Sequence, residues 1–252
     1  IRSAGIPVHE ILLSPLRLDD VGQLIAEALR GAEERTRPLA RLIHDKAGGN
    51  PFFTIQFLAE LAEENLLTFD HDAAAWTWDL PRIHQKGYAD NILDLMGGKL
   101  SRLPTTSQEV LKRFACLGHV ADFATLALLQ GQSEDALHAA LSDVVRSGLL
   151  IRTNRAYRFA HDRVHEAAYI LIPEVERAEA HLRLGRLLAE NLSPKQAAEN
   201  VFDIVNQFNA GQELLRDPEE KGRVADLNLQ AGRRAKAGTA YASAVRYLSV
   251  GM

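Results

Sequence analysis

The segment from Gly48 to Phe53, with the sequence GGNPFF, constrains the fold most, because it places the end of one helix directly beside the start of another. Glycine adopts the left-handed conformation that ends helices at low cost. Asn50 is a favourable N-cap, and Pro51 suits a first helical turn, where its missing N–H is not needed. We therefore expect the chain to turn between two helices at this point.

Composition bounds the class of protein. The 252 residues are 46% hydrophobic, enough for a sizeable core, and we expect more than one domain. The net charge of -4 gives no overall positive field to attract nucleic acid or an acidic membrane. Cys116 is the only cysteine, which indicates a buried thiol, no internal disulfide and a reducing cytoplasm. No apolar stretch approaches the roughly 18 residues that span a bilayer. The start at Ile1 suggests a piece of a longer protein.

Apolar periodicity predicts a mainly α-helical chain with small β-hairpins. Residues 8–13 are predicted to form a short buried strand whose partners are missing from this sequence. A hairpin is expected within 66–80, where Trp76 and Trp78 share one face and either pack or form an interaction surface.

Three predicted helices between residues 106 and 148 precede a second predicted hairpin, and this is the order of a winged helix. Residues 219–252 carry small residues at the offsets that a tetratricopeptide helix pair uses for close packing. One such pair needs stacked neighbours to be stable, so we expect the array to continue beyond the given sequence.

Motifs for catalysis are missing from the sequence. It has no phosphate-binding loop and no GxSxG elbow, and Cys116 lies on a helix face that should be buried. His161 and His165 form the only close histidine pair, and HDRVH lacks the glutamate of a zinc-protease helix. We therefore expect no metal site, and hydrolysis by this segment alone is not expected.

A winged helix raises the possibility of DNA binding, which needs cationic side chains on the exposed face of its third helix. The polar positions of the predicted third helix are mostly acidic or neutral: Glu134, Asp135, His138, Ser142, Asp143 and Arg146. These groups would repel phosphate, so an intramolecular or protein-binding role is favoured over nucleic acid.

Six stretches of the sequence resemble a known class of protein and together extend over nearly the whole chain. They are VHEILLSPLRLDDVGQLI, GGNPFFTIQFLAELAEENLLTFD, WTWDL, FACLG, YRFAHDRVHEAAYILIP and AGRRAKAGTAYASAVRYL. This region is similar to the part that follows the ATPase core in bacterial multidomain signalling kinases. Those proteins place a STAND-class, AAA-related ATPase with tetratricopeptide-like repeats between a serine/threonine kinase-like domain and C-terminal sensory and histidine-kinase modules.

The resemblance implies five regions. Residues 1–17 would end the ATPase core with its last strand, 18–103 would form a helical lid with a β-hairpin insertion, and 104–160 a winged helix. Residues 161–218 would form a helical linker, and 219–252 the start of the repeats. The phosphate loop and the residues that bind magnesium would lie outside this chain.

The resemblance also implies a site for ATP or ADP. The GxP motif of the STAND lid places its proline against adenine, and Gly49, Asn50 and Pro51 match it. Free N–H groups at the helix start would favour a polar or anionic ligand. His161 follows the wing, where STAND regulators carry a histidine that contacts the ADP β-phosphate. Two plainer interpretations remain open: Asn50 and Pro51 only start a helix, and His161 is an N-cap or a buried partner of Asp162.

Together these features predict a regulatory module that couples its nucleotide state to an attached kinase or another protein partner. Asp162, Arg163 and Glu166 are expected to be structural and to pair across helical turns or with the lid, although Arg163 could alternatively reach phosphate. A passive helical scaffold and a winged-helix regulator of transcription are the alternatives.

Overall fold

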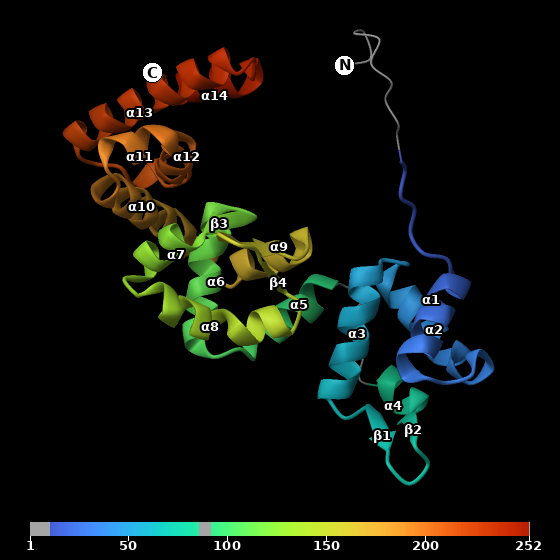
Figure 1. Cartoon of the computed structure of the whole chain (residues 1–252). Helices are drawn as coiled ribbons and strands as arrows, with labels where there is room; N and C mark the ends of the chain where they lie inside the picture. Colours follow the sequence, from blue (N-terminus) through green and yellow to red (C-terminus); the bar gives the residue numbers. More distant parts are fainter. Residues whose placement is uncertain (1–10, 86–91, 252) are drawn as a thin grey trace. The chain divides into compact units, whose positions relative to one another are not determined.

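The computed structural model describes residues 11–85 and 92–251 and divides the chain into two compact units, residues 1–95 and 96–252 (Figure 1). Both units are built mainly from α-helices, with small antiparallel β-sheets. The predicted fold class, mainly α with small hairpins, is therefore confirmed.

The first unit contains three helices followed by a hairpin and a short helix. In chain order its elements are α1 (Leu18–Leu29), α2 (Glu33–Ala47), α3 (Pro51–Glu63), β1 (Leu67–Asp70), β2 (Ala75–Trp78) and α4 (Leu80–Gln85). The boundary between the two units falls within α5 (Ile92–Ser101). Buried side chains of α1, α2, α3 and β1 meet in one core, which includes Val21, Ile25, Leu39, Ile43, Phe53, Phe57, Leu61 and Leu67.

The hairpin expected within residues 66–80 is present, and it lies against this core. Leu67 pairs with Trp78 and Phe69 with Trp76, so the four side chains share one face. Both tryptophans are half-buried against the core. The Arg35 guanidinium stacks 5.0 Å from the Trp78 ring centroid and donates a 2.6 Å hydrogen bond to the Trp76 carbonyl. The two tryptophans are therefore packing residues that fix the hairpin.

The N-terminal segment of the first unit forms no strand within the described residues. The expected strand at 8–13 falls partly outside the described residues, and Ile11, Leu12 and Leu13 are exposed and form no strand. A strand needs a partner to satisfy its backbone groups, and none is paired here. Helix α2 begins at Glu33, and Pro38 lies inside it. The acidic first turn at Glu33 favours this start through the helix dipole.

The second unit begins with helices and a small sheet. Its elements are α6 (Thr105–Leu117), β3 (Val120–Asp122), α7 (Phe123–Gln130), α8 (Glu134–Arg146), β4 (Leu150–Arg152), β5 (Ala156–Phe159) and α9 (Asp162–Ile170). The strands form an antiparallel sheet in the order β3-β5-β4, with Val120 opposite Arg158 and Leu150 opposite Phe159. The β4–β5 hairpin was predicted, but β3 is too short to give a periodic signal.

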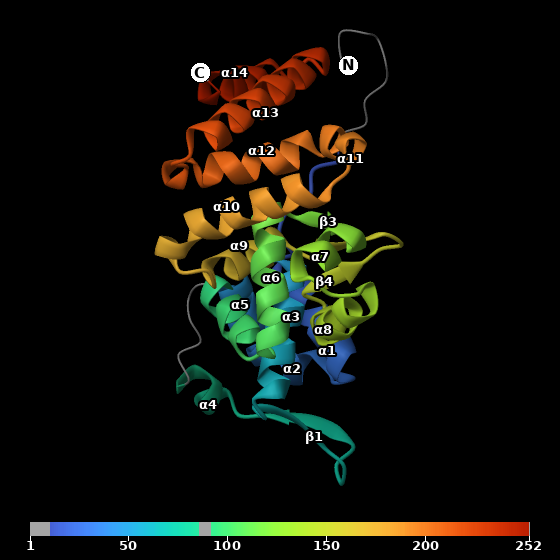
Figure 2. The same ribbon diagram turned by 90° about the vertical axis from the view of Figure 1, so that its left-hand side faces the viewer.

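Helical layers follow in the rest of the second unit. They are α10 (Glu174–Asn191), α11 (Pro194–Glu199), α12 (Val201–Ala210), the 3-10 turn Gln212–Leu214, α13 (Pro218–Ala237) and α14 (Tyr241–Val250). Helix α10 packs on α12, α12 on α13 and α13 on α14, and Figure 2 shows these helices as successive layers. Paired helices therefore begin at α10, before the predicted repeat start at residue 219.

Close contacts and polar pairs hold these layers in register. A Cβ on Gly232 would lie 2.7 Å from Leu248 Cγ, so the absence of a side chain lets α13 and α14 approach. Asn209 and Asn228 exchange two 2.9 Å amide hydrogen bonds between α12 and α13. A register shift would leave these partly or fully buried amides unpaired.

Arg186 and Glu220 join α10 to α13. The guanidinium donates two hydrogen bonds of 2.7 Å to the carboxylate, and this interaction lowers the pKa of Glu220. Glu220 is buried while Arg186 is about half exposed. Solvent therefore screens the ion pair and reduces its contribution to the stability of the fold.

We expect Glu220→Gln to lower the free energy of unfolding by about 1 kcal/mol at neutral pH, since the charged acceptor is lost. The carboxylate has a lowered pKa in the folded state, so its stabilisation is present above the ordinary carboxyl pKa and is lost as pH falls through the lowered value. Urea denaturation of both proteins from neutral pH to about pH 2 should show the difference shrinking. The exposed neighbour substitution Glu219→Gln is the control, and an equal loss in both variants would contradict the prediction.

Candidate functional site

The start of α3 is built as the sequence predicted, with Asn50 as N-cap and Pro51 as the first helical residue. Asn50 Oδ1 accepts hydrogen bonds from the N–H groups of Phe52 at 3.0 Å and Phe53 at 3.3 Å. The next N–H, that of Thr54, donates to the Asn50 carbonyl at 3.0 Å. The first-turn donors are therefore occupied within the fold. The expectation that free N–H groups here would attract an anion is wrong.

The outer surface of this helix start is apolar. Pro51 is exposed, and Ile55, one turn later on the same face, is 54% exposed. Phe52 and Phe53 instead pack edge to face at 5.4 Å and belong to the core of the first unit. The exposed side chains of Pro51 and Ile55 therefore form a small apolar surface at the start of α3.

Gly49 holds this turn against the segment that precedes α1. The Leu16 N–H donates to the Gly49 carbonyl at 2.8 Å, and His44 Nε2–H donates to the Leu16 carbonyl at 3.2 Å. Gly49 has a φ of +71°, and a Cβ there would lie only 2.3 Å from the Leu16 carbonyl oxygen. Gly48 also has a positive φ, of +59°, but its Cβ would meet nothing within 4 Å. Sequence reasoning did not find the Leu16 contact, because no local pattern signals it.

His161 lies in the second unit, at the start of α9, and its N-cap interpretation is confirmed. The backbone is extended there, and Nδ1 accepts the Arg163 N–H at 3.1 Å. An imidazole nitrogen that accepts carries no proton, so the proton of the neutral ring is on Nε2. The alternative of a buried pair with Asp162 is wrong, because the Asp162 side chain is 90% exposed, and its carboxylate lies 3.6 Å from His119 Nδ1.

Arg163 pairs with Glu166 along α9, at 2.6 Å between the guanidinium and the carboxylate. This is the i, i+3 pairing that the sequence predicted for these residues.

The structure gathers three of the four predicted site residues. Gly49, Asn50 and Pro51 lie together in the first unit with Leu16 and His44, while His161 belongs to the second unit.

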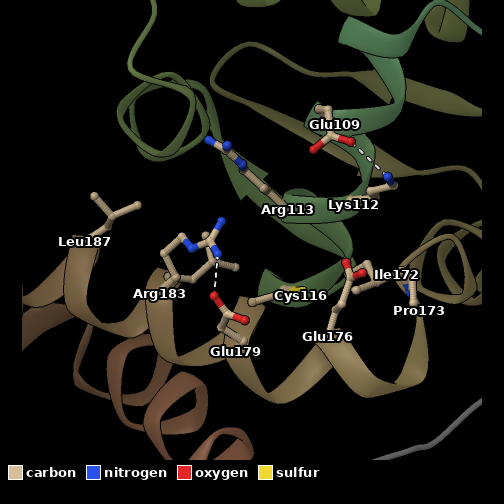
Figure 3. A pocket seen from close by; sticks show the side chains of 12 residues that line it. Glu109, Lys112, Arg113, Cys116, Ile172, Pro173, Glu176, Glu179, Arg183 and Leu187 are labelled. Atoms are coloured by element: carbon tan, nitrogen blue, oxygen red, sulfur yellow. Dashed lines mark hydrogen bonds and ion pairs between the residues drawn. The ribbon is translucent and has the colours of Figure 1, made fainter.

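A groove of about 440 Å³ lies between α6 and α10 of the second unit (Figure 3). Its rim carries charges of both signs that pair locally, Lys112 with Glu109 at 2.8 Å and Arg183 with Glu179 at 2.8 Å. Cys116 lines the groove, and burial raises the pKa of its thiol to about 12. The groove therefore has no electrostatic potential of a single sign, and its cysteine is not a reactive thiolate.

Comparisons with known proteins give one relative. The chain is 24% identical over 296 residues to hybrid signal transduction histidine kinase G of Dictyostelium discoideum. The match covers 96% of this chain but only 9% of the length of that protein. This chain is similar to a region of a signalling histidine kinase. No known protein family matches it.

Neither a membrane-spanning helix nor a metal-binding group is present among the described residues, 11–85 and 92–251. No helix among them has both the length and the apolar character needed to cross a membrane. No group of three or more His, Cys, Asp or Glu side chains in this part of the chain is arranged to hold a metal ion.

We expect Gly49→Ala to destabilise the first unit by about 3 kcal/mol, because the new Cβ adds a backbone clash to the strain of positive φ. Gly48→Ala is the matched control and should cost only about 1 kcal/mol, since it adds strain without a clash. Urea denaturation followed by tryptophan fluorescence reports on the first unit, which contains Trp76 and Trp78. Equal costs for the two substitutions would show that the Leu16 contact does not constrain Gly49.

We expect Cys116 to be unreactive in the folded protein. A pKa of about 12 lowers the thiolate fraction on the order of a thousandfold relative to an ordinary thiol at about pH 8. Iodoacetamide should therefore alkylate the folded chain at least a hundredfold more slowly than the urea-unfolded chain, on the same argument. Reduced glutathione serves as the free-thiol reference, and similar folded and unfolded rates would contradict the prediction.

Proposed function

We propose that this chain is a regulatory part of a STAND-type ATP-binding module, which couples its ADP or ATP state to an attached kinase or another partner. The similarity of 96% of the chain to a region of a signalling histidine kinase supports a signalling role. The order of α6, β3, α7, α8 and the β4–β5 hairpin is compatible with a winged helix. The layered pairs from α10 to α14 are compatible with tetratricopeptide-like repeats.

The observation that carries the proposal is the exposed Pro51 ring at the start of α3. We propose that adenine lies against this ring, beside the exposed side chain of Ile55. Gly49 and Asn50 act by fixing the position of Pro51, since Asn50 occupies the first N–H groups of the helix. The phosphates and Mg²⁺ would then be held by an ATPase core, because this sequence contains no phosphate loop.

His161 would supply the second contact. Its N-cap hydrogen bond engages Nδ1, so the neutral ring carries its proton on Nε2, where it can donate to a phosphate oxygen. ADP would engage Pro51 and His161 in one arrangement of the module, and exchange for ATP would release these contacts. Such a switch requires the two arrangements to differ in nucleotide affinity, because a ligand with equal affinity for both shifts nothing.

A passive helical scaffold is the second candidate. The caps at Asn50 and His161 favour it, because they give both residues a structural role without any ligand. A DNA-binding regulator is less well supported. The exposed polar side chains of α8 include Glu134, Asp135 and Asp143, and its Arg146 is paired with Asp143 at 3.0 Å.

The nucleotide proposal is tested by ADP affinity in a longer form of the chain that includes the preceding ATPase core. We expect Pro51→Ala and His161→Asn each to weaken ADP binding about tenfold, since each removes one contact worth about 1.4 kcal/mol. Asparagine is itself a good N-cap, so His161→Asn removes the imidazole while α9 keeps its start. Isothermal titration calorimetry measures the affinity.

Pro194→Ala is the matched control, because Pro194 also follows a capping residue at the first position of a helix. It should leave ADP affinity unchanged. Unchanged affinity in Pro51→Ala and His161→Asn as well, with helical content intact by circular dichroism, would leave the passive scaffold as the function.

A further inference from the structure

Helix α9 carries three ring side chains at intervals of four residues. His161 caps the helix, and His165 and Tyr169 follow at the i+4 and i+8 positions, so all three lie along one face. Each makes a specific hydrogen bond, and the last two reach side chains or backbone groups of other helices. The first of these bonds lies within α9, and the other two connect α9 to α6 and to α10.

His165 connects α9 to the end of α6. Its Nε2–H donates to the Ala115 carbonyl at 2.9 Å, because a carbonyl can only accept. The imidazole is enclosed by His119, with ring centroids 4.1 Å apart, and by Phe159 at 5.2 Å. Burial lowers the pKa of His165, which favours the neutral ring in this position.

Tyr169 begins a chain of buried or partly buried hydrogen bonds that joins four helices, α9, α10, α12 and α6. Its hydroxyl lies 2.9 Å from His181 Nε2 on α10, and His181 Nδ1 lies 2.7 Å from Gln207 Oε1 on α12. Gln207 Nε2 then donates to the Cys116 carbonyl at 2.8 Å. His181 and Gln207 are both buried, at 8% and 3% exposure.

The Cys116 carbonyl sets the orientation of the Gln207 amide, and through it the side of His181 that donates. The Cys116 carbonyl can only accept, so the Gln207 amide nitrogen faces it and Gln207 Oε1 faces His181. His181 Nδ1 must then donate to Gln207 Oε1, and in the tautomer with its proton on Nδ1 the ring accepts the Tyr169 hydroxyl proton at Nε2. Burial raises the pKa of Tyr169, so its hydroxyl keeps this proton near neutral pH.

This series of hydrogen bonds ends at a carbonyl of α6, the helix to which His165 also donates. Ala115 and Cys116 both lie in the last turn of that helix, whose carbonyls have no partner within the helix itself. One carbonyl is satisfied from α9 and the next from α12. A shift of α9 or of α12 relative to α6 would therefore break the bond to one of these neighbouring carbonyls.

We propose that α9 transmits a disturbance at its His161 cap to the paired helices, by way of Tyr169, His181 and Gln207. The link itself depends only on contacts within the second unit. Its use in signalling rests on the proposed function, in which His161 meets the nucleotide and the paired helices face the partner. Bonds that each require one orientation transmit displacement better than apolar contacts, which tolerate sliding.

The test is amide hydrogen exchange measured by mass spectrometry on the whole chain without nucleotide. His161→Ala removes the cap and should speed exchange in α9 about fivefold, the usual effect of losing an N-cap worth about 1 kcal/mol. We expect exchange in α12 to rise as well, by about threefold, which is the size of coupling found between residues of one network. Repeating His161→Ala in a Tyr169→Phe background should abolish the rise in α12.

Tyr247→Phe is the matched control background. Tyr247 also donates one hydroxyl hydrogen bond to α12, to Asn206 Oδ1 at 3.0 Å, but it lies outside the proposed link. The rise in α12 should persist there. If Tyr169→Phe loses helical content by circular dichroism, Gln207→Asn replaces it, because the shorter side chain breaks the same link.

Two results would overturn the proposal: exchange in α12 that does not respond to His161→Ala, or a response that Tyr169→Phe leaves undiminished. The experiment separates this link from the nucleotide proposal. If the variants leave ADP affinity unchanged but exchange in α12 responds as expected, the nucleotide proposal is contradicted and the proposed link is supported. If the variants weaken ADP binding but amide exchange in α12 does not change, the nucleotide proposal is supported and the proposed link is contradicted.

Discussion

The last turn of α6 is the constraint on which the second unit depends. Its carbonyl groups point away from the helix and are covered by other elements, so each needs a donor from elsewhere in the chain. His165 donates to Ala115 and Gln207 to Cys116. Without these side chains the turn would bury unsatisfied acceptors, at a cost of about 1–3 kcal/mol each. The positions of α9 and α12 are therefore tied to one helix end, and α13 and α14 continue outward from α12.

Helix caps also limit what the candidate site can bind. Asn50 uses its side-chain oxygen for the first N–H groups of α3, and His161 uses Nδ1 for the start of α9. The same groups cannot serve a ligand while they cap. The proposed nucleotide role would therefore use the apolar surface at Pro51 and the His161 imidazole, while the other phosphate contacts and Mg²⁺ would belong to an ATPase core. The structural role of both caps and the proposed regulatory role are compatible, because they use different atoms.

The layered helices beyond α9 combine close packing with oriented polar pairs. Gly232 permits the approach of α13 to α14, while Asn209 with Asn228 and Arg186 with Glu220 allow only one register between their helices. Apolar contacts alone would tolerate small shifts, but buried or partly buried polar pairs lose their partners when helices slide. The proposed transmission through Tyr169 needs such rigidity. If the helices could slide past one another, a displacement of α9 would not reach the helices farther along the series.

The sequence by itself determined the helical class, both predicted hairpins and the start of α3 at Asn50 and Pro51. These features follow from local signals: caps, prolines, glycines and apolar spacing. It did not determine strand β3, the place of Pro38 inside α2, or the partner of Asp162. Only the tertiary structure decided which distant groups meet. Leu16 approaches Gly49 across the first unit, and Gln207 reaches the Cys116 carbonyl, 91 residues earlier in the sequence. Such contacts arise because buried polar atoms must be satisfied by whatever the fold brings near them, and no local pattern records that requirement.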